Sequence, residues 1–351
     1  MPILKCHTED FLQAAKSCPV LDVRSPAEYS HAHIPGAHAF PLFSDEERKQ
    51  IGTTYKQIGR EEAIKIGLDH FGPKMRPMVE EASKILSASG SGSKKLAVHC
   101  WRGGMRSAAV AWLLDFYGFE ILLLEGGYKA YRNWVLQQFE LPYALRIIGG
   151  YTGSNKTGII QEMRRRGLRA IDYEHLASHK GSAFGRLGMP PQPSQEQFEN
   201  MLAAELYSLR EQDAQAPIWV EDESQRIGTV NIPNGLFRQM REQAILFLNI
   251  PFEERLNFIV ETYGVHDKAL LLNGIERIAK KLGGPESREA MAYLQEGQIK
   301  ACFRILLSYY DRYYLKSSMK REKPEHNVIM TPLQGTDPII NLNLIHEHSR
   351  I

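Results

Sequence analysis

The chain has 351 residues, of which 43% are hydrophobic and 24% charged, a composition typical of globular proteins and a length sufficient for two domains. Its formal net charge of +2 is too small to indicate a nucleic-acid partner by itself, and no apolar run approaches the roughly 20 residues of a membrane helix, so we expect no membrane partner. Four cysteines are too few for a disulfide scaffold in so long a chain, which favours a reducing compartment and predicts a cytoplasmic protein.

Short apolar runs alternate with helical patterns over residues 1–140, which we predict to form one domain. The runs typical of buried strands are Cys18–Val23, Leu96–His99 and Glu120–Leu124. The helical patterns cover Glu9–Ala15, Asp45–Ile58, Arg60–Phe71, Pro77–Ser87 and Ser107–Phe116. This alternation predicts an α/β fold with a mainly parallel sheet that helices cover on both faces.

Cys100 follows the second of these strands and begins a loop that contains two glycines. The loop leads directly into the helix predicted at Ser107–Phe116. Parallel sheets place their sites at the carboxyl ends of strands, and backbone N–H groups with a helix N-terminus at such a place stabilise a thiolate. A thiolate there is a nucleophile that can carry sulfur, selenium or a phosphoryl group, and Arg102 and Arg106 add positive charge around it.

Three further segments accompany this cysteine. Asp22–Tyr29 has the sequence Asp-Val-Arg-Ser-Pro-Ala-Glu-Tyr, His33–Ala37 has His-Ile-Pro-Gly-Ala, and Leu124–Tyr128 has Leu-Glu-Gly-Gly-Tyr. Together with the loop of Cys100, these motifs make the first domain resemble a rhodanese domain. The resemblance implies that the cysteine carries a persulfide or a perselenide.

Other polar residues of this domain are predicted to be structural. Asp22 and Arg24 are expected to form an ion pair beneath the loop. His31, His33 and His38 crowd one segment, but no cysteine or carboxylate pair completes a zinc-like spacing, so we predict no metal there.

The position of Arg106, six residues after Cys100, leaves a second chemistry open. His-Cys-x5-Arg is the pattern of cysteine phosphatases, in which the cysteine attacks phosphorus and the arginine holds the phosphate bidentately. The alternative function is therefore a cysteine-dependent phosphatase with a nucleotide-binding module. It predicts turnover of a generic aryl phosphate.

A second domain is predicted over residues 145–351, after a boundary near Pro142. An apolar strand leads into a stretch that is nearly Gly-x4-Gly-Lys-Thr, and a helix follows. In such a P-loop, backbone N–H groups cradle a diphosphate, the lysine neutralises it and the threonine can hold Mg²⁺. Asn155 replaces the expected glycine, and asparagine is among the few residues that tolerate a left-handed backbone. The candidate diphosphate-binding residues are Gly150, Gly153, Ser154, Asn155, Lys156 and Thr157.

The rest of this domain continues as a P-loop NTPase-like α/β fold with a helical C-terminal region. The apolar run Pro217–Val220 ends in three acidic residues, Glu221-Asp222-Glu223, as in a Walker B segment that holds Mg²⁺ or orients water. Ala244–Ile250 is a further buried strand. A helix is predicted over Phe252–Tyr263, and helices continue to about Leu315.

Two polar stretches of the second domain suit phosphate or RNA. Asp172–Arg186 is predicted to be a long functional loop that places cations beside glycines. Tyr309–Tyr314, followed by a basic run at Lys316–Lys323, offers rings on which unpaired RNA bases can stack. The candidate acid/base or binding residues are Asp172, His179, Lys180, Arg186, Glu223, Ser224 and Arg226.

A rhodanese domain followed by a P-loop domain resembles the tRNA 2-selenouridine synthase family. Further matching segments are His99–Ser107, Asp172–Gly185 and Glu223–Gly228. The resemblance implies a transferase that replaces sulfur by selenium at C2 of the wobble 2-thiouridine of certain tRNAs, with selenophosphate as the donor. It also implies that the sulfur is first geranylated from geranyl diphosphate, and that selenium then displaces the S-geranyl group.

On this resemblance, Cys100 carries the selenium, Arg102 and Arg106 hold the anionic donor, and the P-loop binds the diphosphate of geranyl diphosphate. The implied partners are tRNA that contains 2-thiouridine and the enzyme that produces selenophosphate. We expect no tightly bound cofactor and no metal other than Mg²⁺ at Thr157. A third hypothesis is an RNA-binding P-loop ATPase with a passive rhodanese adaptor, which predicts RNA-stimulated ATP hydrolysis that is insensitive to loss of Cys100.

Overall fold

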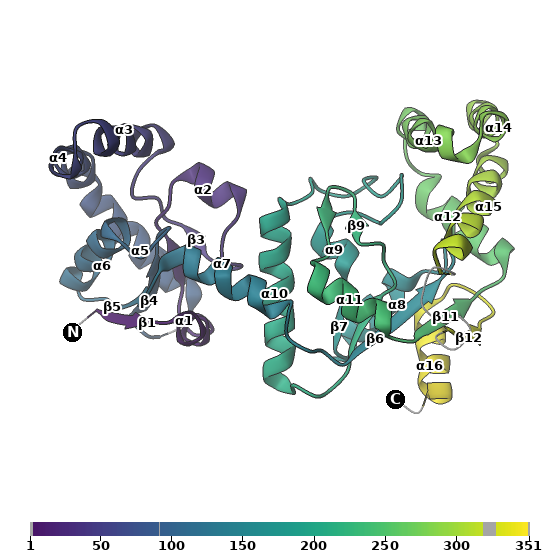
Figure 1. Cartoon of the computed structure of the whole chain (residues 1–351), viewed down its shortest axis with the longest axis horizontal. Coiled ribbons are helices and arrows are strands. Elements are labelled where there is room, and N and C mark those ends of the chain that lie inside the picture. Colours follow the sequence, from purple (N-terminus) through teal and green to yellow (C-terminus); the bar gives the residue numbers. More distant parts are fainter. Residues whose placement is uncertain (1–2, 91, 319–327, 350–351) are drawn as a thin grey trace. The chain divides into compact units, whose positions relative to one another are not determined.

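The computed structural model describes residues 3–90, 92–318 and 328–349, and it contains two five-stranded parallel sheets accompanied by helices (Figure 1). The chain divides into two compact units, Met1–Gln138 with Glu199–Ala204, and Phe139–Phe198 with Glu205–Ile351. Among the helices of the described residues, none is long and apolar enough to cross a membrane.

The first unit alternates strands and helices as predicted. Its elements are β1 (Leu4–Cys6), α1 (Thr8–Ala15), β2 (Val20–Asp22), α2 (Pro26–His31), β3 (His38–Ala39), α3 (Asp45–Gln57), α4 (Arg60–Phe71), the 3-10 helix η1 (Gly72–Lys74), α5 (Met75–Ser89), β4 (Lys95–His99), α6 (Met105–Tyr117), β5 (Glu120–Leu124) and α7 (Gly127–Gln138). The parallel strands lie in the order β1-β5-β4-β2-β3. Strand β4 is therefore central, and Cys100 follows its carboxyl end.

The side chains of β4 alternate between two layers of core. Leu96 and Val98 belong to a hydrophobic cluster that also contains residues of α5 and α6. The ring of His99 instead contacts Phe11 of α1 and Tyr128 of α7, with ring centroids 6.3 and 6.2 Å away. Because successive strand residues point to opposite faces, helices cover both faces of this sheet, as the sequence predicts.

The second unit has the same alternation and ends in helices. Its elements, which include the helix α10 shared with the first unit, are β6 (Leu145–Gly150), α8 (Lys156–Arg165), β7 (Ala170–Ile171), α9 (Tyr173–Ala177), α10 (Gln195–Gln212), β8 (Ile218–Glu221), β9 (Arg226–Ile227), β10 (Val230–Asn231), α11 (Asn234–Glu242), β11 (Ile245–Asn249), α12 (Phe252–Tyr263), α13 (Lys268–Leu282), α14 (Gly284–Gln295), α15 (Ile299–Ser318), β12 (Val328–Pro332) and α16 (Pro338–Ser349). The parallel strands lie in the order β12-β11-β6-β8-β7, so β6 is central and neighbours β8.

Helices α12 to α15 form the helical region predicted for the second domain (Figure 1). They have their own apolar core, which includes Leu256, Ile275, Leu294 and Phe303. A separate cluster joins α8 and α16 to the sheet. The predicted architecture is thus confirmed, because one α/β domain with a parallel sheet precedes a second one that carries a helical region.

The prediction of a continuous loop over Asp172–Arg186 is wrong at its start, where Tyr173–Ala177 form α9. Asp172 caps this helix, because its side chain accepts a hydrogen bond from the amide of His175 at 2.8 Å. The sequence analysis also did not predict α10, β12 and α16. The basic run Lys316–Lys323 lies outside the residues whose side chains the structure describes.

Candidate functional site

The loop that begins at Cys100 is held in shape by the glycines of the turn before α7. A Cβ atom added to Gly127 would lie 2.4 Å from the carbonyl oxygen of Cys100 and 2.4 Å from the amide nitrogen of Gly103, so the two backbones touch. Both glycines have positive φ values, +60° and +64°. The amide of Tyr128 donates to the carbonyl of Cys100 at 2.8 Å, which fixes the loop on the first turn of α7.

The sulfur of Cys100 is buried and lies 3.1 Å from the hydroxyl of Ser107 in the first turn of α6. The hydroxyl of Ser107 also lies 3.2 Å from the carbonyl of Gly104. A serine hydroxyl has a single proton, which it can donate to a thiolate at Cys100 or to that carbonyl. Ser107 is thus a polar partner of the sulfur that the sequence analysis missed, although it stands in the same motif seven residues later.

Arg106 forms an ion pair with Glu28 of α2, with 2.7 Å between Nη1 and Oε2. Burial by itself would raise the pKa of Glu28, but the hydrogen bond and charge of Arg106, with the amide of Ser25 and the charge of Arg48, lower that pKa to about 2. A donor anion must therefore compete with a carboxylate for Arg106. Arg102 is exposed, and the structure gives its side chain no partner within the described part of the chain.

Asp22 and Arg24 form the predicted structural ion pair. Both are buried, with 2.6 Å between Arg24 Nη2 and Asp22 Oδ2, and the guanidinium lies 3.7 Å above the ring of Tyr128. Burial lowers the pKa of the neighbouring His99 to about 4, so this histidine is neutral at pH 7. His33 lies just before the turn at Pro35 and Gly36, and its Nδ1 lies 3.0 Å from the carbonyl of Tyr29.

The P-loop of the second unit joins β6 to α8 and has Asn155 at the N-cap of the helix. Asn155 has φ +54° and ψ +40°, so it adopts the left-handed conformation that the sequence predicts it can tolerate. Its side chain accepts a hydrogen bond from the amide of Gly158 at 3.2 Å and donates to the carbonyl of Thr336 at 2.9 Å. The asparagine therefore keeps the backbone geometry that the pattern assigns to glycine and caps α8 as well.

Lys156 and Thr157, in the first turn of α8, both point back toward the loop and its acidic neighbours. Lys156 Nζ donates to the carbonyl of Gly150 at 3.2 Å, which places its charge across the P-loop. Thr157 Oγ1 lies 2.8 Å from a carboxylate oxygen of Glu174 and 3.2 Å from one of Glu221. Glu174 belongs to α9, so the unpredicted helix contributes directly to this site.

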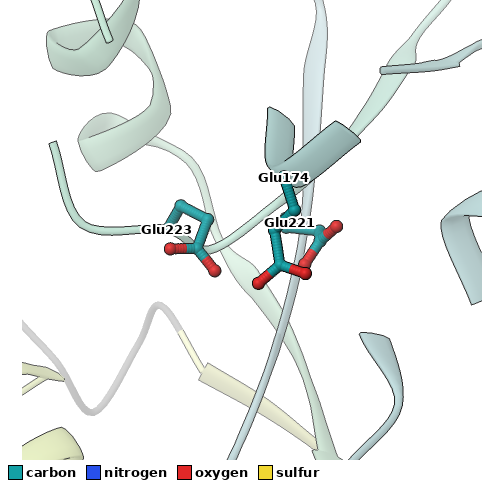
Figure 2. Close-up of side chains that lie close together, drawn as sticks. All are labelled: Glu174, Glu221 and Glu223. Carbon is teal, nitrogen blue, oxygen red and sulfur yellow. The ribbon is translucent and has the colours of Figure 1, made fainter. Parts of the chain in front are cut away.

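Three carboxylates meet beside Thr157, as Figure 2 shows for Glu174 of α9, Glu221 at the end of β8 and Glu223 just after it. One oxygen of each lies within 4.8 Å of the others. Glu221 is fully buried, and its Oε1 has no hydrogen-bond partner among the described residues. Burial, followed by the charges of neighbouring carboxylates, raises the pKa of all three groups, that of Glu223 to about 8.

This acidic cluster, Glu174 with Glu221 and Glu223, fits a divalent cation. Hard cations such as Mg²⁺ take carboxylate and hydroxyl oxygens, and the cluster brings three carboxyl groups together beside the hydroxyl of Thr157, where a cation would replace the protons that their raised pKa values retain. The residues that would hold Mg²⁺ are therefore Thr157 and the acidic cluster. The sequence analysis selected Glu223 and Thr157 but left Glu174 out of its candidates, because Glu174 precedes β8 by more than forty residues.

The raised pKa of Glu223 predicts that the second unit loses stability as the pH rises. The folded state keeps a proton that the unfolded chain releases above pH 4.5, so the free energy of unfolding falls between pH 4.5 and about 8. Each released proton changes it by at most about 1.4 kcal/mol per pH unit. Urea unfolding of the full chain between pH 5 and 9 measures this slope. Mg²⁺ and Glu223→Gln should each reduce the slope, whereas stability that rises with pH in metal-free wild type would contradict the prediction.

One cavity of about 620 Å³ connects the P-loop, the acidic cluster and the helical region of the second unit. Its polar end includes Lys156 and Thr157, and its other walls carry aromatic and aliphatic side chains from α12 and α15. A cavity of this size suits a small organic molecule. The predicted site residues that line it are Gly150, Gly153, Asn155, Lys156, Thr157, Lys180, Glu223 and Ser224.

Several predicted residues face away from this cavity within the described structure. Ser154 donates to the carbonyl of Tyr151. Asp172 is buried as the cap of α9, and Arg226 donates to the carbonyl of Gly228 at 2.9 Å, so both hold local backbone. His179 is buried, and its burial, with the charge of the exposed Arg186, lowers its pKa.

The aromatic run on α15 contributes to the wall of the cavity. Tyr310, Tyr313 and Tyr314 line it, and stacking of RNA bases on Tyr309–Tyr314 stays a prediction. Tyr314 donates to a carboxylate oxygen of Asp222 at 2.6 Å, which fixes it beside the end of β8. The cavity wall is therefore continuous from the acidic segment onto α15.

Comparisons with known proteins agree with this two-part architecture. Residues 7–133 match the family model of the rhodanese-like domain, and residues 143–331 match the model described as the tRNA 2-selenouridine synthase AAA domain. The chain is 33% identical to the tRNA 2-selenouridine synthase of Marinobacter nauticus, over 88% of this chain and 90% of the relative. It is 37% identical to that of Nitrosomonas europaea, over 70% and 63%, and 33% identical to that of Hydrogenovibrio crunogenus, over 90% and 94%. The chain therefore belongs to the tRNA 2-selenouridine synthase family.

Proposed function

We propose that this protein converts wobble 2-thiouridine of tRNA to 2-selenouridine, with selenophosphate as the selenium donor and an S-geranyl intermediate made from geranyl diphosphate. Its relatives are named tRNA 2-selenouridine synthase, and its two domains match the models of that family. The proposed partners are tRNA and the enzyme that produces selenophosphate. The four cysteines are free, which supports the proposed reducing, cytoplasmic location.

The observation that carries the proposal is the cavity, because its lining matches both ends of a prenyl diphosphate. The P-loop amides and Lys156 suit the diphosphate, and the apolar walls from α12 and α15 suit the hydrocarbon chain. A ligand with a nucleoside in place of the prenyl chain would bury polar groups against these apolar walls, which costs free energy.

The first step forms a bond from the 2-thiouridine sulfur to C1 of the geranyl chain and breaks the C1–O bond of geranyl diphosphate. The bonding electrons leave with diphosphate, whose charge Lys156 and the P-loop amides are placed to stabilise, and the N3 proton of the base is released to solvent. Mg²⁺ held by Thr157 and the acidic cluster would supply further positive charge. Alkylated sulfur is a better leaving group than the original thiocarbonyl sulfur, which prepares C2 for replacement of sulfur by selenium.

The second step, assigned to the first unit, forms a bond from selenium to C2 and breaks the C2–S bond, so that geranyl thiolate leaves. The selenium–phosphorus bond of selenophosphate is broken by water, which gives phosphate and keeps selenium at the selenide level. Cys100 lies at the carboxyl end of the central strand, its sulfur is next to a hydroxyl donor, and the loop carries the exposed Arg102. We assign Cys100 as the selenium carrier and Arg102 as a cation for the anionic donor. Arg106 serves as a second cation only when it leaves Glu28.

The phosphatase alternative is less well supported. It needs Arg106 to clasp the phosphate bidentately, and that guanidinium is paired with Glu28 at 2.7 Å. The alternative of a P-loop ATPase predicts RNA-stimulated ATP hydrolysis that is insensitive to loss of Cys100, which an ATPase assay with and without tRNA tests.

The test is nucleoside mass spectrometry of tRNA that contains 2-thiouridine, after incubation with the protein, geranyl diphosphate and selenophosphate. We expect S-geranyl-2-thiouridine without selenophosphate and 2-selenouridine with both reagents. Unchanged tRNA from folded protein would refute the proposed function. Turnover of an aryl phosphate by the same preparation would favour the phosphatase.

A further inference from the structure

The apolar side of the cavity follows one face of α15. The residues that line it recur every three or four positions, as expected for one face of a helix, and are Phe303, Leu306, Leu307, Tyr310, Tyr313 and Tyr314. This face extends about 16 Å along the helix axis. Tyr314 lies at one end of this face, and its ring centroid is 6.1 Å from that of Tyr151 in the P-loop. This end of the face is therefore next to the proposed diphosphate site.

At the other end of this face, three aromatic rings close the cavity. The ring centroid of Phe184 lies 6.1 Å from that of Tyr263 on α12 and 6.0 Å from that of Phe303 on α15. Tyr263 and Phe303 are themselves 6.2 Å apart, so the three rings form a closed triangle. All three residues line the cavity.

The backbone around Phe184 is fixed against the same helix. The amide of Ala183 donates to the hydroxyl of Tyr310 at 3.3 Å, and the amide of Phe184 donates to the hydroxyl of Ser182 at 3.2 Å. Phe184 is the single member of the ring triangle that comes from a segment outside α12 and α15. The position of the Phe184 ring therefore depends on the segment of residues 182–184 and on the residue that packs against the far side of the ring.

Gly274 of α13 lies directly behind the ring of Phe184. A Cβ atom at Gly274 would be 2.3 Å from the ring, so the edge of the Phe184 ring packs directly against the backbone of α13. A glycine inside a helix destabilises it relative to alanine, and here it makes room for the ring. The ring therefore has no space to move back toward α13.

We propose that Phe184, seated on Gly274, is the residue that sets the length of prenyl chain accepted by this cavity. The inference rests on the proposed function, because it concerns the hydrocarbon end of the same diphosphate substrate. Removal of the ring lengthens the apolar end of the cavity toward α13. A methyl group at Gly274 pushes the ring of Phe184 into the cavity and shortens the apolar end of the cavity.

The experiment compares prenyl transfer to 2-thiouridine tRNA from the five-, ten- and fifteen-carbon diphosphates dimethylallyl, geranyl and farnesyl diphosphate. A single methylene changes hydrophobic-pocket selectivity by roughly 10- to 200-fold. We therefore expect Phe184→Ala to raise the farnesyl-to-geranyl ratio at least about tenfold. Gly274→Ala should instead raise the dimethylallyl-to-geranyl ratio, by about fivefold or more, because its methyl group displaces the ring by less than a full isoprene unit.

Leu294→Ala is the matched control, because Leu294 is buried in the same helical core and lies outside the residues that line the cavity. It should leave both ratios within twofold of wild type. If Phe184→Ala does not fold, Phe184→Leu and Gly274→Ala decide the question. If wild type transfers geranyl and the folded variants keep the same ratios, the proposed role of Phe184 is overturned, whereas the proposed function stands. Failure of wild type to transfer any prenyl group would overturn the proposed function instead.

Discussion

Cys100→Ser is expected to abolish selenium incorporation while leaving geranylation of 2-thiouridine intact. The sulfur of Cys100 is the proposed nucleophile of the first unit, and Ser107 is its hydrogen-bond partner. A serine hydroxyl at that position stays protonated and cannot replace a thiolate as selenium carrier. We expect the rate of 2-selenouridine formation to fall at least about 10³-fold, as measured on tRNA that has already been S-geranylated.

The matched control for this variant is Cys18→Ser. Cys18 is also buried in the first unit, but its thiol donates to the carbonyl of Ala14 at 3.2 Å and lies in no glycine-rich loop. Selenium incorporation by this control should stay within about threefold of wild type. Full selenation by Cys100→Ser would remove the cysteine from the mechanism and leave the first unit without its assigned role.

Lys156→Ala should give the opposite pattern, with loss of geranyl transfer and an unchanged selenium step. Lys156 bridges the P-loop through the carbonyl of Gly150 at 3.2 Å, which holds its ammonium where the proposed function places the diphosphate. Loss of one such preorganised group lowers a rate by about 10² to 10³. The measurements are geranyl transfer to 2-thiouridine tRNA and, separately, selenation of S-geranylated tRNA.

Two further variants test whether the effect is specific to Lys156 and whether it depends on charge alone. Lys280→Ala removes an exposed cation of α13 from the same unit and should leave geranyl transfer unchanged. Lys156→Arg keeps the charge but replaces a compact ammonium by a larger planar group, so it should restore only part of the activity. Normal geranyl transfer by Lys156→Ala would show that the diphosphate does not bind at the P-loop.

Cys100→Ser and Lys156→Ala also test how the two domains share the reaction. If each domain performs one step, a mixture of the two variants should produce 2-selenouridine, because tRNA geranylated by one can be selenated by the other. If both steps need both domains of one chain, the mixture should be as inactive as the variants alone.

Much of this architecture was accessible from contiguous stretches of sequence. The loop at Cys100 and the P-loop are runs of neighbouring residues between a strand and a helix, and their chemistry depends mainly on local backbone geometry. Asn155 illustrates this well, because its tolerance for positive φ is a property of the residue type, and the structure has it at φ +54°. The alternation of strands and helices likewise predicts two parallel sheets.

Tertiary structure decided how side chains from distant segments share these sites. Arg106 meets Glu28 across 78 residues of sequence, and Thr157 meets Glu221 across 64, so neither pairing can be derived from local spacing. Phe184 rests on Gly274 because a loop and a helix of the same domain pack together. The sequence alone determined which chemical groups the protein possesses and which local turns present them. Packing between elements decided which of those groups meet, because contact depends on how buried faces fit together and not on order along the chain.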